Sequence, residues 1–184
     1  MKNEDYYWFF QNKLDAELKA PGKWTRDLQT SDIEFKVYFN VKGICKENKL
    51  REFYFKFLHR IIVTKKEWCL YDIECNSACV YCQESDSISH PFIHCRWSNQ
   101  FFSEVIKRFN KENDTSYSLN TIELLFGKLS NEPDPGSSQK MLKELNYVLL
   151  FAKYYIYNNK LSSKQGSLNE FTRKLEFKYH LEGF

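Results

Sequence analysis

The chain has 184 residues, which is enough for one ordinary domain with a sizeable core. Hydrophobic residues make up 42% and aromatic residues 17%, with 6 Gly and 4 Pro, and this composition excludes disordered, collagen-like and low-complexity proteins. The net charge of +3 does not by itself indicate a nucleic-acid-binding protein. No apolar run approaches the ~20 residues of a bilayer crossing, and the first residues lack the apolar core of a secretory signal. We therefore expect an intracellular protein, nuclear or cytoplasmic, without a membrane partner.

The chain opens with a predicted helix. Apolar residues at helical spacing predict this helix over residues 6–18, and Pro21 with Gly22 is a typical helix stop. A shorter segment follows over residues 31–39.

The strongest helical pattern of the first half covers residues 49–62. Its apolar residues recur at i, i+3, i+4 and i+7, which makes a wide apolar face. Lys49, Lys56 and Arg60 recur at i, i+7 and i+11. At about 100° per residue these three side chains are predicted to project from one side of the helix.

The second half is predicted to be helical around a cysteine-rich stretch at residues 75–95, whose middle is a polar loop. No alternating run is long enough to demand a sheet. The first predicted helix after this stretch opens at Pro91 and continues to Phe109. A two-turn helix follows, with Asn120 and Glu123 as its capping pair and Gly127 as its end. After a loop at residues 130–138 come a long helix over residues 139–158 and a last helix with Ser167 and Glu170 as its capping box.

Six cysteines in an intracellular chain are tested first for metal ligation rather than for disulfides. Cys79, Cys82, His90 and Cys95 give the spacing C-x2-C-x7-H-x4-C. A C-x2-C pair turns two thiolates toward one point, and Zn²⁺ in a structural site takes four ligands in a tetrahedron. Because the protein fills all four positions, the predicted ion is one structural zinc per chain.

The spacing leaves two alternative ligands open. His94 lies next to Cys95 and at i+4 from His90, so a Cys2His2 site is locally as plausible as Cys3His. Cys75 is a fourth-ligand candidate through its C-x3-C spacing to Cys79. The predicted fold class is mainly α, a helical domain with an inserted CCHC zinc knuckle.

Further blocks accompany the cysteine motif in a fixed order. They are residues 50–61, which include a His-Arg pair, the Leu-Phe-Gly step at 125–127, and the Ala-Lys-Tyr-Tyr-Ile-Tyr run at 152–157. With these blocks, residues 23–183 resemble the reverse transcriptase zinc-binding domain, which follows the polymerase in the second open reading frame of LINE-type non-LTR retrotransposons. The ligands of that family match Cys79, Cys82, His90 and Cys95, so the resemblance favours Cys95 over His94.

The resemblance implies a non-catalytic zinc-binding domain that binds nucleic acid. Such a domain is a C-terminal fragment of a LINE-type reverse transcriptase and helps hold template RNA or target DNA. The implied partners are RNA or DNA, bound mostly through the backbone, and a full-length reverse transcriptase in trans. The Tyr-x-Asp-Asp carboxylate pair of a polymerase and the motifs of an endonuclease are both missing, so we expect no enzyme.

Basic and histidine side chains near the knuckle are the candidates for contact with nucleic acid. The alternative is a solvated helix face for Lys49, Lys56 and Arg60, and a histidine satisfied within its helix for His59. Lys153, Tyr154 and Tyr157 on the long helix are further candidates. A second interpretation of the whole chain is a zinc-stabilised protein interaction module that docks on a reverse transcriptase or a host factor. The candidates near the knuckle are Lys49, Lys56, His59, Arg60 and Arg96.

The predicted organisation has four parts in one domain. They are an N-terminal helical extension at residues 1–22, a zinc-binding helical domain at 23–130, a loop at 131–138, and a C-terminal helical pair at 139–184 that packs on the same domain.

Overall fold

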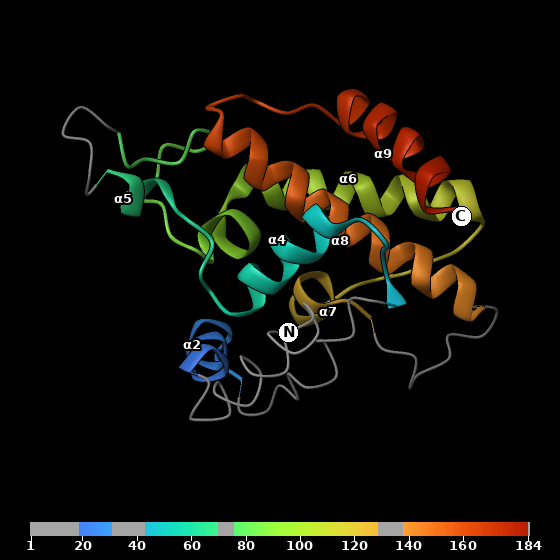
Figure 1. Ribbon diagram of the computed structural model, residues 1–184, viewed down its shortest axis with the longest axis horizontal. Coiled ribbons are helices and arrows are strands. Elements are labelled where there is room, and N and C mark those ends of the chain that lie inside the picture. The colour runs from blue at the N-terminus through green and yellow to red at the C-terminus, as the bar shows by residue number, and fades with distance from the viewer. Residues whose placement is uncertain (1–18, 31–42, 70–75, 129–137, 184) are drawn as a thin grey trace, which may run out of the picture.

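The computed structural model describes residues 19–30, 43–69, 76–128 and 138–183, and it is mainly helical, as predicted (Figure 1). Within these ranges no strand forms, and one isolated antiparallel bridge joins Ala78 to Ser85. No helix in these ranges is long and apolar enough to cross a membrane. The elements are α2 (Lys19–Leu28), α4 (Asn48–Leu58), α5 (Lys65–Trp68), the π-helical turn η2 (His90–His94), α6 (Arg96–Asn113), α7 (Thr121–Phe126), α8 (Gln139–Leu161) and α9 (Leu168–Glu182).

The long helix α8 forms the centre of the fold. It contacts α4, α6, α9 and η2, and Figure 1 shows it running through the middle of the molecule. Its sequence contains neither Gly nor Pro, and Ser138 caps its start by accepting a hydrogen bond from the N–H of Met141 at 3.1 Å. Buried side chains surround most of its circumference, as expected for a helix inside a core. The helix predicted over residues 139–158 is confirmed and extends to Leu161.

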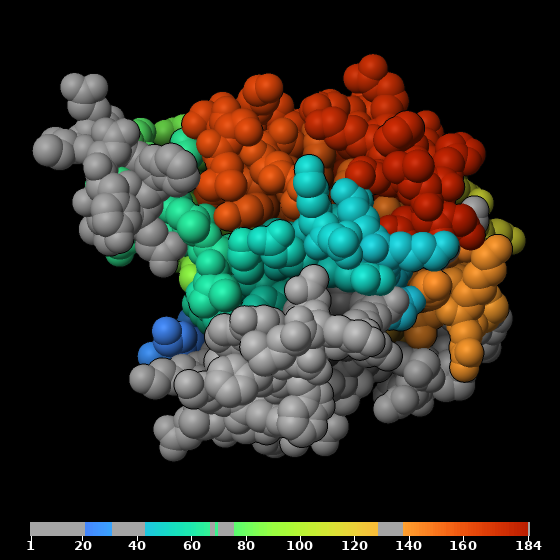
Figure 2. Space-filling view, in the orientation of Figure 1, coloured from blue at the N-terminus to red at the C-terminus, as the bar shows by residue number. Residues whose placement is uncertain are grey.

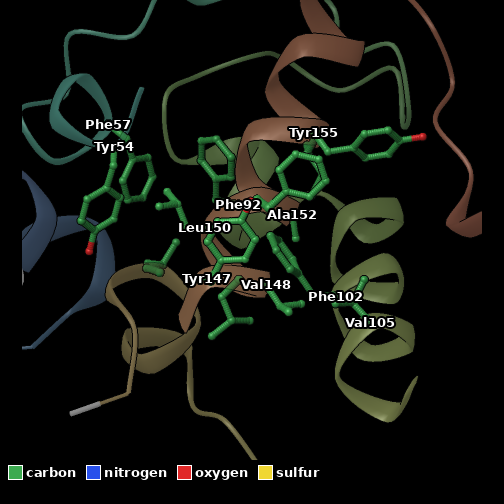
Figure 3. Close-up of a cluster of buried hydrophobic side chains, with 14 of the residues drawn as sticks. Tyr54, Phe57, Phe92, Phe102, Val105, Tyr147, Val148, Leu150, Ala152 and Tyr155 are labelled. Carbon is green, nitrogen blue, oxygen red and sulfur yellow. The ribbon is translucent and has the colours of Figure 1, made fainter. Parts of the chain in front are cut away.

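The core is strongly aromatic where α4, η2 and α6 meet α8 (Figure 3). The ring of Phe57 on α4 lies 5.1 Å from the ring of Phe92 on η2, in an edge-to-face arrangement. Phe101 on α6 stacks on Tyr155 of α8 with ring centroids 5.7 Å apart. Because aromatic side chains remove large apolar areas from water, these contacts account for much of the packing between elements that are distant in sequence.

The helix α2 corrects one prediction. Pro21 and Gly22 do not end a helix, because both lie inside α2. Proline fits there since the first turn of a helix leaves its N–H groups without helical partners. The fully buried Trp24 then fixes α2 to the end of α4, where its Nε1 donates to the carbonyl of Leu58 at 3.0 Å. The helix predicted over residues 6–18, the segment at 31–39 and most of the loop at 130–138 lie outside the described residues.

The helix α4 ends at Leu58, earlier than the predicted residue 62. Arg60 has φ of +56°, and the N–H of Ile61 donates to the carbonyl of Lys56 at 2.9 Å while the N–H of Arg60 donates to that of Phe57 at 3.0 Å. This pair of bonds is a Schellman motif, which usually has glycine where Arg60 stands. Lys49, Lys56 and Arg60 therefore do not share one helix face, which corrects the prediction.

Both predicted helix caps are present. The Asn120 side chain accepts from the N–H of Glu123 at 2.9 Å, and the Glu123 carboxylate accepts from the N–H of Asn120 at 2.9 Å. Gly127 ends α7 with φ of +96° and ψ of 158°, a positive φ outside the predicted left-handed helical region. At the start of α9, Ser167 accepts from the N–H of Glu170 at 3.2 Å. In place of a direct bond from the N–H of Ser167 to the Glu170 carboxylate, the Tyr155 hydroxyl bridges the two. It accepts from the N–H of Ser167 and donates to Glu170.

Glu182 fastens the end of α9 to the start of α4. Its side chain is buried, and its carboxylate accepts from the N–H groups of Lys46 at 2.6 Å and Glu47 at 2.9 Å. Lys178 pairs with Glu47 at 2.7 Å beside it. The first turn of α4 has no acidic residue of its own, so the Glu182 carboxylate supplies the negative charge that a helix N-terminus favours.

Glu182→Ala is expected to lower the free energy of unfolding by about 1–3 kcal/mol, because two backbone N–H groups lose their acceptor. Urea denaturation followed by circular dichroism measures the change. Glu176→Ala, at an exposed site on the same helix, is the control and should change stability by less than about 0.5 kcal/mol. Equal effects of the two variants would show that Glu182 does not fasten the helices.

Candidate metal centre

The four predicted ligands lie together. One ligand atom from each of Cys79, Cys82, His90 and Cys95 falls within 4.8 Å of the others. The sulfur atoms of Cys79 and Cys95 are 3.9 Å apart, and Cys82 Sγ lies 3.1 Å from His90 Nε2. A tetrahedron with zinc–sulfur bonds of ~2.3 Å and zinc–nitrogen bonds of ~2.0 Å has edges of about 3.8 Å and 3.5 Å. The group therefore has about the size that one tetrahedral metal ion requires.

A tight hairpin presents the first two cysteines. The N–H of Cys79 donates to the carbonyl of Glu84 at 2.8 Å, and the N–H of Gln83 donates back to the carbonyl of Cys79 at 2.9 Å. Gln83 has φ of +65°, and the bridge between Ala78 and Ser85 closes the hairpin. The turn is short enough to bring the Cys79 and Cys82 side chains to one point, as the C-x2-C spacing predicts.

The turn η2 presents the other two ligands and corrects the predicted helix start. Residues from Pro91 onward do not continue into α6, because Cys95 is extended, with ψ of 116°, and is the residue before α6. The N–H of Cys95 donates to the carbonyl of His90 at 2.8 Å, which closes η2 as one π-helical turn. Both side chains enter the buried group, whereas His94 between them is exposed and is not part of it. The geometry thus favours Cys3His over Cys2His2, while Cys75 lies outside the described residues.

Hydrogen bonds and burial give the three thiols of the group different pKa values. The hydrogen bond to Cys95, followed by burial, raises the pKa of the Cys79 thiol to about 12. The same bond with Cys79, helped by the backbone N–H and the hydroxyl of Ser98, lowers the pKa of Cys95 to about 7. Burial raises the pKa of Cys82. Cys95 is therefore the thiol that most readily becomes a thiolate. Binding of a metal cation would release the protons of the Cys79 and Cys82 thiols, because the ligands must be thiolates.

Each ring nitrogen of His90 has a neighbouring side chain. Its Nε2 faces Cys82 Sγ, and its Nδ1 lies 3.9 Å from the exposed carboxylate of Glu84. The backbone N–H of His90 donates to Ser87 Oγ at 3.0 Å. A carboxylate behind a metal-binding histidine fixes the ring orientation and makes the ligand nitrogen more basic. The loop between the ligands thus places a carboxylate near the ring nitrogen of His90 that does not face Cys82.

Asp86 and Lys160 tie the hairpin to the central helix. Both side chains are fully buried, and the Lys160 ammonium pairs directly with Asp86 Oδ1. The other oxygen, Asp86 Oδ2, accepts from the backbone N–H of Lys65 at 2.9 Å. Lys65 is the first residue of α5. No local pattern in the sequence indicates this pair, because its two members are distant in the chain and each alone is typical of a surface.

Aromatic stacking adds a second link between the hairpin and the helices. Tyr81, between the two cysteines, stacks on Trp97 with ring centroids 4.1 Å apart and an interplanar angle of 10°. Trp97 stacks in turn on Phe101, and the Tyr81 hydroxyl donates to the carbonyl of Ile156 at 3.2 Å. Trp97 therefore packs inside the fold next to the ligands instead of presenting its ring for contact with a partner.

The predicted nucleic-acid-binding residues have different environments. Lys49 and Lys56 are exposed on α4, with Lys56 paired to Glu52 at 2.5 Å, and Arg96 is exposed at the start of α6. The Arg60 side chain is 12% exposed, and its guanidinium pairs with Asp27 at 2.8 Å and lies 4.4 Å from the ring centroid of Trp24. The His59 ring packs on Phe55, and burial lowers the pKa of His59.

Lys153 is a buried residue of the core, not a surface contact for nucleic acid as the sequence suggested. Its ammonium donates to the carbonyls of Leu124 at 3.0 Å and Leu125 at 2.7 Å, near the end of α7. Burial lowers the pKa of Lys153 to about 7. Tyr154 and Tyr157 on the same helix pack against Phe53, with ring centroids 5.4 Å and 5.3 Å from it.

The arrangement can hold a metal ion but leaves no free position on it. Four side chains from one hairpin and one turn supply a complete tetrahedral set, so water or substrate would have to displace a protein ligand. Comparison of the chain with protein-family models, with curated proteins and with solved structures found no match in any of the three.

Proposed function

We propose that the chain is a non-catalytic domain that is stabilised by one zinc ion and binds RNA or DNA, as the C-terminal region of a LINE-type reverse transcriptase does. The observation that carries the proposal is the buried Cys3His group. The ordered sequence blocks around the same four residues support the same class of function. In such an element the domain helps hold template RNA or target DNA, and a full-length reverse transcriptase in trans is the proposed protein partner.

Zinc is the proposed ion because three thiolates and one imidazole are a ligand set typical of structural zinc. The four ligands join the hairpin, η2 and the start of α6, which are otherwise linked by few backbone hydrogen bonds. Since the unfolded chain has no such site, the free energy of zinc binding adds to the stability of the fold.

We expect no polymerase or nuclease turnover from this chain. Phosphoryl transfer at such sites depends on metal ions that keep open positions for substrate oxygens. The Cys3His group offers four protein ligands to a tetrahedral ion, so the proposed zinc has no position to offer. The proposed role is therefore binding alone.

Exposed cations support binding through the phosphate backbone. Lys49, Lys56 and Arg96 are exposed, and Arg96 directly follows the ligand Cys95. Arg60 is held by Asp27 and Trp24, so it contributes less than the sequence suggested. Contacts to phosphate groups do not depend on which base is attached, so we expect little sequence preference.

The zinc-loaded chain is expected to bind a labelled single-stranded RNA with an affinity that falls steeply as salt rises. Reversal of two cations in Lys49→Glu/Lys56→Glu should weaken binding and reduce the salt slope by about 0.7 for each phosphate that the protein no longer neutralises. Fluorescence anisotropy across a salt series measures both quantities. Arg60 is left in place because its reversal would disturb α2.

The matched control is Lys107→Glu/Lys111→Glu, which reverses two exposed cations on α6 and changes the net charge equally. Equal losses in the two double variants would show a general effect of charge and would exclude a specific α4 surface. If the unaltered chain binds no nucleic acid even at low salt, the proposed function is wrong and the zinc-stabilised protein interaction module becomes the better interpretation.

A further inference from the structure

A groove opens beside α9, on the outer side of the fold. Its lining comes from α9 and from one residue of α8, the buried Phe151. Phe177 stands at this groove with 64% of its surface exposed. In the space-filling view, α9 lies on the visible face beside the segment that begins α4 (Figure 2), and the ion pair between Lys178 and Glu47 joins the two. The α9 groove is lined by Phe151, Glu170, Arg173, Lys174, Phe177 and Lys178.

The groove is cationic as well as aromatic. Three of its lining residues are basic and one is acidic. Glu170 is already engaged, since it pairs with Lys174 at 2.7 Å and accepts from the Tyr155 hydroxyl at 2.7 Å. Lys174 remains half exposed, and Arg173 has no ion pair with any residue in the described ranges. Lys178 pairs with Glu47, so the cation that stays without an ion pair in the described ranges, next to the exposed ring of Phe177, is Arg173.

Helix geometry explains why these side chains share one face. Phe171 is buried and Leu175 is partly buried, so the inner face of α9 packs on α8 and α6. Arg173 and Phe177 are four residues apart, and both lie on the exposed face. An aromatic ring beside cations on a solvent-facing helix is the arrangement that single-stranded nucleic acids use, with bases stacked on the ring and phosphates near the cations.

We propose that the α9 groove binds a single strand of RNA or DNA, with one base stacked on Phe177 and the neighbouring phosphates contacted by Arg173 and Lys174. The proposal rests on the proposed function and adds a base-stacking surface to it. An acidic protein segment could also pair with the cations. Such a segment would contact the apolar side chain of Leu181, which is 63% exposed one turn further along α9, as readily as the ring of Phe177. The aromatic ring inside the cationic groove favours a nucleic-acid strand, since every base offers a face for stacking.

The test compares two labelled strands of equal length and charge, an oligothymidine of about ten nucleotides and its abasic counterpart. Phe177→Ala in the zinc-loaded full chain should weaken binding to oligothymidine about tenfold and leave binding to the abasic strand unchanged. Phe177→Tyr should restore the affinity. Arg173→Glu should weaken binding to both strands, because it removes a cation that neutralises phosphate.

Leu181→Ala is the matched control, since it removes an equally exposed apolar side chain from the same helix and should leave binding unchanged. Wild-type affinity for oligothymidine in Phe177→Ala would overturn the groove proposal while leaving nucleic-acid binding intact. Equal losses in Phe177→Ala and Leu181→Ala, on both strands, would also overturn it, because an effect that needs neither the ring nor the bases is not base stacking on Phe177. Failure of the unaltered chain to bind any strand would instead overturn the proposed function, and this proposal with it.

Discussion

Cys95→Ser is expected to lower the zinc affinity by more than about 100-fold, because even the loss of a partner behind a ligand reaches that size. Cys95 is fully buried and has the lowest thiol pKa of the three cysteine ligands, so its thiolate is the first anchor for the ion. At a zinc concentration of about 1,000 times the wild-type dissociation constant, an affinity about 100-fold weaker removes about 2.7 kcal/mol of stabilisation and lowers the melting temperature by about 5–11 °C. Differential scanning calorimetry with metal analysis of the same samples measures both effects.

Two control variants show whether the effect belongs to the metal group. Cys45→Ser replaces another buried thiol that is not part of the group and should leave the zinc content unchanged. His94→Ala should also keep the metal, because His94 is exposed and outside the group. A Cys95→Ser variant with full zinc content, together with loss of zinc in His94→Ala, would make the site Cys2His2.

Asp86→Ala is expected to destabilise the fold by about 3–5 kcal/mol, since it leaves the Lys160 ammonium buried without its counter-charge. The N–H of Lys65 loses its acceptor in the same variant. Chemical denaturation of the zinc-loaded protein measures the change. Because Asp86 lies on the hairpin that carries Cys79 and Cys82, the variant should also weaken zinc binding, which a competition titration with a chelator detects.

The double variant Asp86→Leu/Lys160→Met tests the cause. It removes both charges and should recover most of the stability, because a buried ion pair is often replaced by apolar groups at little cost. Glu112→Ala breaks the exposed pair with Arg108 and should cost about 0–1 kcal/mol. A loss in Asp86→Ala no larger than the loss in Glu112→Ala would contradict a structural role for the buried pair.

Local patterns allowed the metal group and the helix caps to be predicted from the sequence. The C-x2-C spacing forces a tight turn whatever lies around it, so Cys79 and Cys82 converge as expected. The caps at Asn120 and Ser167 depend on side chains within three residues of the helix start. Choosing Cys95 over His94 needed more than spacing, because the extended backbone at Cys95 decides which side chain turns inward.

Features that depend on distant contacts could not be predicted. Arg60 ends α4 in a conformation that usually requires glycine, and Trp24 and Asp27 from α2 hold its side chain there. Lys153 was a candidate for contact with nucleic acid, but it lies in the core, where its side-chain nitrogen donates to the carbonyls of Leu124 and Leu125. The sequence also missed α2, since Pro21 permits the first turn of a helix as well as the end of one.

The most direct test of the zinc site is X-ray absorption at the zinc edge of the purified, zinc-loaded chain. We expect one zinc per chain with three sulfur neighbours at ~2.3 Å and one nitrogen at ~2.0 Å, and no further light atom. Such a result would match the group formed by Cys79, Cys82, His90 and Cys95. A coordination sphere with two sulfur and two nitrogen atoms, or with a bound water, would contradict the closed Cys3His site.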